Sequence, residues 1–219
     1  TDDALSTILK FEAKQGVTSV ALASMTMGKK TLKKAFKSAA SFRPKENEAS
    51  LEGIYMEGPF ISPNKIGAQN PKFLKPLDLD FFKTLQKVSG NLIKCLVVAP
   101  ELDGAIDFIK EVKDKVRVSL GHTNCDYQTA SSAFEAGARE LTHTFNAMPP
   151  MLHRAPGPIV AASENAKVLA ELICDGVHVN PAMVRMAFKL FSKDNIVMIS
   201  DSMMATGLEN GTYALGGQK

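Results

Sequence analysis

Short apolar runs rich in β-branched residues alternate along the chain with amphipathic stretches. Several of these runs are apolar on both faces, which is typical of strands buried on both sides of a sheet. The runs follow one another at intervals of about 30 residues, the length of one strand–helix unit. We therefore predict seven strands, which begin near Val17, Glu52, Leu92, Lys115, Ala138, Lys167 and Asn195.

The stretches between the predicted strands carry signals of helix starts and ends. Asp2 or Asp3 is suited to cap a helix over residues 4–15, which Gly16 would end. Pro181, a residue favoured in a first helical turn, begins a helix that ends near residue 193. Further helices are predicted over residues 78–89 and 126–136, each closed by a glycine.

Seven consecutive strand–helix units predict an α/β fold, a (β/α)8 barrel of the TIM type. A doubly wound open sheet is the alternative, but no glycine-rich dinucleotide fingerprint follows any predicted strand. An eight-stranded barrel usually takes about 250 residues. We therefore expect residues 1–219 to form one catalytic barrel domain with seven of the eight strands, and no second domain.

The composition is that of an ordinary globular chain, with 45% hydrophobic and 22% charged residues. The net charge is only +3 and the basic residues are dispersed, apart from a lysine run over residues 29–34 that indicates the solvated face of a helix. Nucleic acid is therefore not an expected partner. Cys95, Cys125 and Cys174 are far apart and odd in number, which argues against a disulfide framework.

Membrane and secretion signals are not found in the sequence. No window of about eighteen apolar residues predicts a membrane span, and the start TDDALS lacks a basic stretch followed by an apolar one. We therefore expect a cytoplasmic protein without a membrane partner.

Unusual polar residues follow five of the predicted strands. Glu57 ends the second strand, His122 follows the fourth, His143 the fifth, His178 the sixth and Asp201 the seventh. In a barrel, the carboxyl ends of the strands share one rim, and that rim holds the active site in essentially every characterised barrel enzyme. The sequence therefore predicts one site built from these five residues.

Each of these residues also has a structural explanation when it is taken alone. A histidine after a strand is often only a hydrogen-bonded loop residue, Glu57 precedes Gly58 and Pro59 and would cap a turn, and Asp201 suits an Asx turn. Five such coincidences on one rim are less probable than one site. The shared site is therefore the preferred interpretation.

Two imidazoles and a carboxylate are a common first shell for a divalent transition metal with positions left open. Glu57, His122 and His143 form this set. A metal held there makes hydrolysis of an amide or ester accessible, with Asp201 as general base and later acid. His178 suits substrate contact or polarisation of a carbonyl, although a further ligand role stays open.

Arg154 lies in the loop MLHRAPGP, close in sequence to the proposed rim. Its planar guanidinium is suited to bidentate contact with a phosphate or a carboxylate. A surface salt bridge explains the residue equally well from spacing alone. For Cys125, three residues beyond His122, a small buried thiol is the preferred interpretation.

At these residues the sequence resembles the N-acetylglucosamine-6-phosphate deacetylases of the amidohydrolase superfamily. The resemblance extends from about residue 52 to residue 217. It rests on the combination of MEGPF with KIGAQNP, LGHTN, LTHTFNAMPPMLHR, ELICDGVHV and ISDSMMATGLENGTYALGG.

The resemblance implies hydrolysis of the N-acetyl group of N-acetylglucosamine 6-phosphate to glucosamine 6-phosphate and acetate. It implies one or two zinc or iron ions, with Glu57, His122 and His143 as metal ligands and Asp201 as the catalytic acid/base. His178 or the metal would stabilise the oxyanion. The residues implied to contact the sugar phosphate are Ala68, Asn146, Ala147, Arg154 and His178. A homodimer is also expected from the family.

Two departures from the family pattern stand out. The family usually has histidine where this chain has Gln69, whose amide still offers a hydrogen bond to a ligand. The family also begins with a small β domain and a first barrel strand carrying a His-x-His-like motif, and this sequence contains neither. We therefore expect the chain to correspond to the central barrel portion.

Three other functions are compatible with these residues. One is deacetylation of a related sugar phosphate such as N-acetylgalactosamine 6-phosphate. A second is a cyclic amidase related to dihydroorotase, but no predicted strand ends in the lysine that this class generally needs. The third, from another class, is a non-catalytic barrel that binds a metal or a sugar phosphate.

Overall fold

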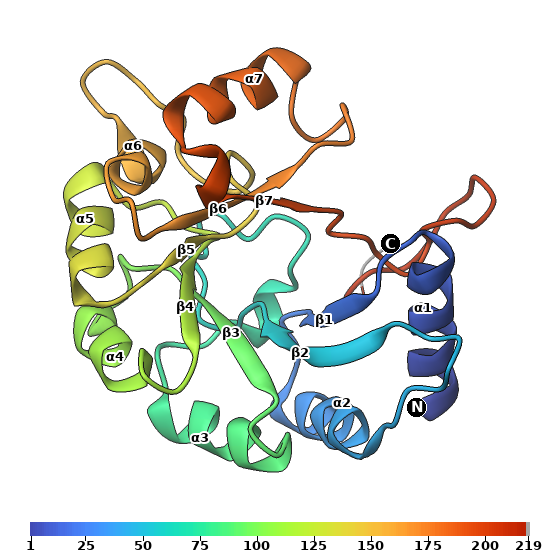
Figure 1. Ribbon diagram of the computed structural model, residues 1–219. Coiled ribbons are helices and arrows are strands. Elements are labelled where there is room, and N and C mark those ends of the chain that lie inside the picture. The colour runs from blue at the N-terminus through green and yellow to red at the C-terminus, as the bar shows by residue number, and fades with distance from the viewer. Residues whose placement is uncertain (218–219) are drawn as a thin grey trace.

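The computed structural model describes residues 1–217, whose seven strands form one curved parallel sheet with the helices arranged around its outside (Figure 1). Neighbouring strands in the sheet are also neighbours in the sequence, in the order β1 to β7. The strands are β1 (Ser19–Ser24), β2 (Ser50–Met56), β3 (Ile93–Val98), β4 (Arg117–Leu120), β5 (Glu140–Leu141), β6 (Leu169–Ile173) and β7 (Ile196–Ile199).

This strand order confirms the barrel prediction and excludes the doubly wound alternative. A doubly wound sheet reverses its strand order at a switch point, whereas every pair here is parallel and sequential. All seven predicted strands are present. The fifth is much shorter than its apolar run indicated, because the pairing with β6 stops at Leu141 and the chain turns away at His143.

Seven α-helices and two short 3-10 helices are present within residues 1–217, and all but α1, which precedes β1, lie between strands. Their bounds are α1 (Asp2–Lys14), α2 (Lys29–Ser41), η1 (Pro71–Phe73), α3 (Leu79–Val88), α4 (Ala105–Val112), α5 (Tyr127–Ala136), α6 (Gly157–Ser163), α7 (Pro181–Leu190) and η2 (Lys193–Asn195).

The helix predictions are confirmed with one corrected cap and two omissions. Thr1 caps α1, because its hydroxyl accepts from the amide of Ala4, so the assignment to Asp2 or Asp3 was wrong. Asp78 and Asp126 cap α3 and α5 in the same way. The sequence pattern did not single out α4 and α6, which span only eight and seven residues.

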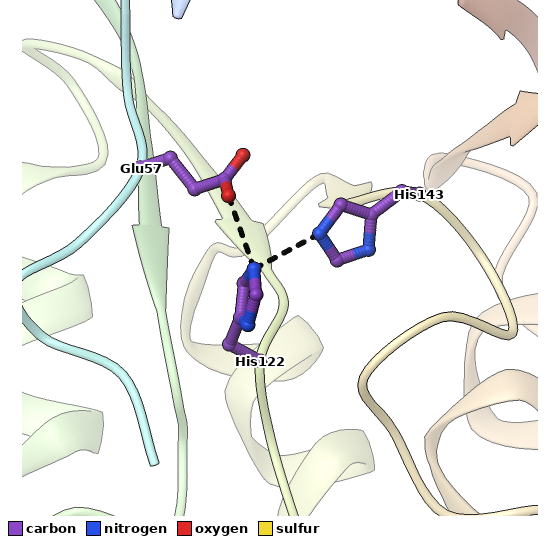
Figure 2. Close-up of side chains that lie close together, drawn as sticks. All are labelled: Glu57, His122 and His143. Carbon is purple, nitrogen blue, oxygen red and sulfur yellow. Dashed lines mark hydrogen bonds and ion pairs between the residues drawn. The ribbon is translucent and has the colours of Figure 1, made fainter. Parts of the chain in front are cut away.

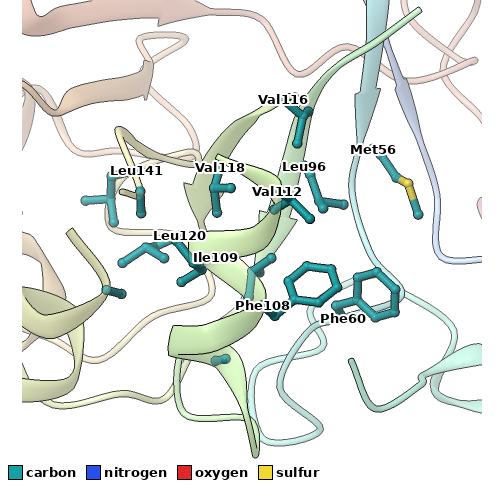
Figure 3. Close-up of a cluster of buried hydrophobic side chains, with 14 of the residues drawn as sticks. Met56, Phe60, Leu96, Phe108, Ile109, Val112, Val116, Val118, Leu120 and Leu141 are labelled. Atoms are coloured by element: carbon teal, nitrogen blue, oxygen red, sulfur yellow. The ribbon is translucent and has the colours of Figure 1, made fainter. Parts of the chain in front are cut away.

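The core lies where the apolar faces of the helices pack against the sheet. Phe60, in the loop after β2, packs edge-to-face against Phe81 of α3 and Phe108 of α4. These rings continue into the apolar side chains of β2 to β5, part of which Figure 3 shows. The packed core therefore supports the strands whose carboxyl ends carry the predicted site residues.

The last described residues return to the first helix. Ser202 donates a hydrogen bond to Glu12 of α1, and Gly207 lies against the ring of Phe11. Figure 1 shows the same proximity of the C-terminal segment and α1. None of the helices described here is long and apolar enough to cross a membrane.

Candidate metal and active site

Three buried side chains converge at the carboxyl ends of β2, β4 and β5 (Figure 2). His122 Nε2 lies 3.0 Å from Glu57 Oε1 and 3.1 Å from His143 Nε2. All three possible ligand atoms lie within 4.8 Å of one another. The structure therefore brings together the carboxylate and the two imidazoles that the sequence predicted as a metal-binding set.

The backbone at this rim adopts unusual conformations. His122, His143 and Asp201 have φ angles of 45°, 30° and 48°, in the left-handed region that side chains other than glycine rarely enter. Each of them follows the end of a strand. Strained backbone of this kind clusters at functional sites, where the surrounding structure holds it in place.

The hydrogen bonds around His122 indicate a cation. Its Nδ1 lies 2.8 Å from the main-chain oxygen of Lys65, which only accepts, so Nδ1 carries a proton. In a neutral ring Nε2 is then a lone pair, facing the carboxylate of Glu57 and the Nε2 of His143. Three electron-pair donors pointing at one another repel unless a proton on His122 Nε2 or a metal ion lies between them. These residues therefore fit a divalent metal.

The ionisation of Glu57 and His143 is compatible with metal binding. Burial lowers the pKa of His122, but the hydrogen bond to Glu57 and the Glu57 charge outweigh burial and raise that pKa. Burial raises the pKa of Glu57, but the hydrogen bond from His122 and the two nearby imidazoles outweigh it and lower that pKa below its usual value. Burial lowers the pKa of His143, and the neighbouring His122 lowers it further. The arrangement thus favours an ionised carboxylate and a neutral His143, the forms that bind metal.

Asp201 follows β7 and is exposed in the described structure. Desolvation of its carboxyl, followed by the negative charge of Glu57, raises its pKa, while the two buried histidines and His178 act in the opposite direction. Asp201 is therefore close enough to the three converging side chains for their charges to act on it. It is absent from the set of possible metal ligands.

His178 lies outside the converging set. It is exposed in the loop after β6, and its Nδ1 is 2.6 Å from Oδ2 of Asp175. The hydrogen bonds from His178 and Val177 lower the pKa of Asp175 to about 2. Asp175 therefore fixes the orientation of the His178 ring, with Nδ1 occupied and Nε2 directed elsewhere.

Gln69 takes part in the site through Glu57. Its Nε2 donates to Glu57 Oε1 at 2.5 Å, and its Oε1 accepts from the amide of Thr26 at 2.7 Å. The side chain is buried, so both ends of the amide are held by the protein. The structure places this residue beside a possible metal ligand, a contact that the sequence did not predict.

The other predicted substrate residues lie in two loops around the histidines. The amide of Thr123, directly after His122, donates to the main-chain oxygen of Ala147, and Asn146 Nδ2 donates to the main-chain oxygen of His143. Ala68 is exposed in the loop after β2, one residue after Gly67, which lies against the His122 ring. The structure therefore brings these loops together beside His122.

Arg154 is exposed in a turn closed by hydrogen bonds between Leu152 and Ala155. It forms no ion pair with any residue between 1 and 217. The surface salt bridge considered from the sequence is therefore not formed within this part of the chain. Cys125 is buried, as expected, and burial raises the pKa of its thiol to about 12.

A surface hollow of about 580 Å³ lies at the opposite rim, beneath the amino ends of β1 and β2. It is lined by side chains of α1 and of the segments before those strands, among them Lys10, Val17 and Glu48. None of the predicted site residues lines it. The candidate site is therefore identified by the side chains that converge there, and not by this hollow.

The sequence did not single out Glu171, which lies within β6 on the inner side of the curved sheet. Its Oε2 accepts hydrogen bonds from the His143 amide at 3.2 Å and from the Tyr55 hydroxyl at 3.1 Å. Burial, and next the charge of Glu140, raise the pKa of Glu171 to about 9. The sequence feature that could have identified Glu171 is a carboxylate in the middle of the otherwise apolar strand LAELI.

Comparison with curated proteins finds relatives along almost the whole chain, whereas no protein-family model matches the sequence. An N-acetylglucosamine-6-phosphate deacetylase of Bacillus subtilis is 38% identical over 209 residues, which cover 93% of this chain and 53% of the relative. An N-acetylgalactosamine-6-phosphate deacetylase of Escherichia coli O157:H7 is 34% identical over 219 residues, covering 99% of this chain and 58% of the relative.

A solved structure agrees with these relatives. An N-acetyl-D-glucosamine-6-phosphate deacetylase mutant of Mycobacterium smegmatis, in complex with N-acetyl-D-glucosamine-6-phosphate, superposes with a TM-score of 0.92 at 31% identity. The match covers 99% of this chain and 56% of that one. The chain is similar to the N-acetylglucosamine-6-phosphate deacetylases. The resemblance predicted from the motifs is confirmed, and the chain spans about half the length of these deacetylases.

Proposed function

We propose that this chain forms the catalytic barrel of a metal-dependent deacetylase. The reaction is hydrolysis of the N-acetyl group of N-acetylglucosamine 6-phosphate to glucosamine 6-phosphate and acetate. The observation that carries this proposal is the convergence of Glu57, His122 and His143 in a chain similar to N-acetylglucosamine-6-phosphate deacetylases. On this proposal residues 1–219 are one domain.

In this proposal Glu57, His122 and His143 hold one divalent ion, zinc or iron, and a second ion stays open. A bound divalent ion supplies a Lewis acid that polarises a carbonyl and lowers the pKa of water. The Lys65 carbonyl keeps the proton of His122 on Nδ1, and Gln69 orients the Glu57 carboxylate by donating to it. These contacts hold the ligands in their metal-binding forms before substrate arrives.

Asp201 serves as the general base and then as the general acid. Its carboxylate accepts the proton of the attacking water, and the same group returns this proton to the departing amine of the sugar. Its raised pKa supports this role, because a carboxyl that holds a proton more readily is better matched to both transfers. His178, held by Asp175, stabilises negative charge on the acetyl oxygen or contacts the substrate.

The remaining residues hold the substrate away from the reacting bond. Asn146 and Ala147 lie in the loop that contacts Thr123, beside His122, and Ala68 and Gln69 lie in the loop whose Gly67 lies against the His122 ring. Arg154 binds the 6-phosphate, since it is exposed and without an ion pair to the residues described here. Fixing the phosphate places the amide correctly for attack.

The wider setting is proposed from the family resemblance. The protein acts in the cytoplasm as a homodimer, with an amino-sugar phosphate as its small-molecule partner. Neither nucleic acid nor a membrane is a partner in this proposal, which is in keeping with a net charge of only +3 and with helices too short or too polar to cross a membrane over residues 1–217.

A second candidate is deacetylation of N-acetylgalactosamine 6-phosphate. It is favoured by the relative of that name in Escherichia coli O157:H7, which matches 99% of this chain. The two substrates differ only in the configuration of one sugar hydroxyl. The metal site and the phosphate contact are therefore shared by both proposals.

Acetate release by the complete gene product that contains this chain tests these proposals. The metal-loaded protein is given each of the two sugar phosphates, with unphosphorylated N-acetylglucosamine as the control. Higher kcat/KM for N-acetylglucosamine 6-phosphate is expected. A preference for the galactosamine epimer would favour the second candidate, and metal binding without any turnover would favour a non-catalytic barrel.

A further inference from the structure

We infer that Glu171 is a positioning residue for His143, acting through the main chain of the proposed metal ligand. The inference rests on the proposed metal site and adds a residue on β6 to it. The side chain of Glu171 accepts from the main-chain amide of His143, not from its ring. It fixes the peptide that carries the imidazole.

The ladder between β5 and β6 ends too early to hold His143. The pairing covers only Glu140 with Leu169 and Leu141 with Ala170, and β5 ends at Leu141. His143 lies two residues further on, with a φ angle of 30° that takes it out of strand geometry. Regular sheet hydrogen bonding therefore does not fix this ligand.

Glu171 supplies the two acceptors that the ladder lacks at this point. The amide of His143 donates to the Oε2 atom of Glu171 at 3.2 Å, and the amide of Thr144 donates to the main-chain oxygen of Glu171 at 2.8 Å. Two successive amides at the ligand are thus bound by a single residue of the neighbouring strand. A left-handed residue held in this way keeps its strained conformation.

The side chain of Glu171 is itself fixed from across the barrel. The Tyr55 hydroxyl, on β2, lies 3.1 Å from Glu171 Oε2 and 2.8 Å from the hydroxyl of Thr142. Thr142 in turn lies 2.6 Å from Ser119 of β4. Because β2 and β6 are not neighbours in the sheet, this network spans the inside of the curve, and its carboxyl acceptor cannot shift freely.

The need for a main-chain anchor follows from the ring of His143. Metal-binding histidines usually donate their other ring N–H to an oxygen atom, which fixes the ring. Within residues 1–217, the buried Nδ1 of His143 has no hydrogen-bond partner. Orientation of this ligand therefore depends on its backbone, which Glu171 holds.

The test compares substitutions of Glu171 in the complete gene product, freed of metal and titrated with Co²⁺. Glu171→Gln keeps an oxygen acceptor for the His143 amide, whereas Glu171→Met keeps the approximate size and removes the acceptor. Leu172→Ala is the matched control, because Leu172 is buried on the same strand and packs in a different cluster, with Val179 and Ala187.

Three readouts separate positioning from a general loss of stability. Glu171→Met is expected to weaken Co²⁺ binding by about 10- to 100-fold, the usual effect of losing a partner of a metal ligand, and to change the Co²⁺ absorption spectrum. It is also expected to speed hydrogen exchange at the His143 amide in the metal-free protein. Glu171→Gln should keep the Co²⁺ affinity, the Co²⁺ spectrum and the slow exchange of the His143 amide. Leu172→Ala should lower only the melting temperature.

A Glu171→Met protein that bound Co²⁺ with unchanged affinity and spectrum would overturn the inference, as would equal weakening by Leu172→Ala. Glu171→Met also removes the acceptor of the Tyr55 hydroxyl, so in Glu171→Met combined with Tyr55→Phe no tyrosine hydroxyl is left without that acceptor, and Thr142 keeps its contact with Ser119. Recovery of tight Co²⁺ binding in this double variant would equally contradict the inference.

The outcome is distinguishable from failure of the proposed function. If the unsubstituted protein bound no Co²⁺ and released no acetate, the proposed metal-dependent deacetylation would be wrong. The His143 exchange rate in the metal-free protein would still support the anchor if Glu171→Met alone raised it, and would contradict the anchor if it did not.

Discussion

Gln69 donates a hydrogen bond from Nε2 to Oε1 of Glu57, the same oxygen that faces Nε2 of His122. The other end of the Gln69 amide accepts from the main-chain amide of Thr26, two residues after the end of β1. Gln69 therefore links the loop after β1 to the carboxylate at the end of β2. Its conversion to an apolar residue would release both groups at once.

Gln69→Leu is expected to lower both stability and metal affinity. The buried Thr26 amide would lose its acceptor, which typically costs about 1–3 kcal/mol, and Glu57 would lose the donor that orients it. Thermal melting and metal titration measure the two effects. Asn64→Ala, at an exposed position in the same loop, is the control, and identical melting of the two variants would contradict the role given to Gln69.

The metal-binding set is tested by removing its histidines. His122→Ala and His143→Ala should each lose most of the bound metal in elemental analysis, because two of the three converging ligand atoms do not hold an ion as tightly as three. His153→Ala serves as the control, since His153 is exposed in the loop before α6. Stoichiometric metal in both site variants would remove the assignment.

The fold was predictable because burial on both faces leaves a pattern in the sequence. β2, β3 and β6 are apolar or small at most positions, and each was expected from its run alone. The length of β5 was not predictable in the same way. β5 ends shortly before His143, whose backbone is left-handed and whose amide donates to Glu171. This arrangement depends on the neighbouring strand β6 and not on the sequence of β5 alone.

The candidate site divides in the same manner. Glu57, His122 and His143 could be predicted because residues that follow parallel strands must meet at one rim. The partners of these residues could not, since Gln69 reaches Glu57 only through the path of a long loop, and Glu171 reaches His143 only through the register between β5 and β6. Sequence position determines which residues meet, and packing determines how they are held.

Recognition of the 6-phosphate is tested at Arg154. Arg154→Ala should reduce kcat/KM for the phosphorylated sugar by roughly 10- to 150-fold, because a hydrogen bond to a charged group is worth about 1.5–3 kcal/mol. Turnover of unphosphorylated N-acetylglucosamine should hardly change. Arg185→Ala, at an exposed position of α7, is the control, and equal losses on both sugars would mean that Arg154 supports its loop instead.

The three cysteines should differ in their reactivity. Cys125 is buried, and its pKa of about 12 leaves only about one thiolate in ten thousand at pH 8, whereas Cys174 is exposed. An alkylating reagent should therefore modify Cys174 first, as peptide mass spectrometry would show. At pH 9 Cys125 should still be almost entirely in the thiol form and should still be labelled far more slowly than Cys174 in the folded protein. Rapid labelling of Cys125 at pH 8 would contradict its burial.

Asp201→Asn is expected to separate proton transfer from metal binding. The amide cannot take the proton of the attacking water, and removal of a general acid/base typically costs about 10²- to 10⁴-fold in kcat. Metal content should stay unchanged, because Asp201 lies outside the three converging ligands. Asp194→Asn makes the same chemical change at an exposed residue just before β7 and should leave kcat intact. Loss of metal from Asp201→Asn would make Asp201 a ligand, and near-normal turnover with metal retained would refute its role in proton transfer.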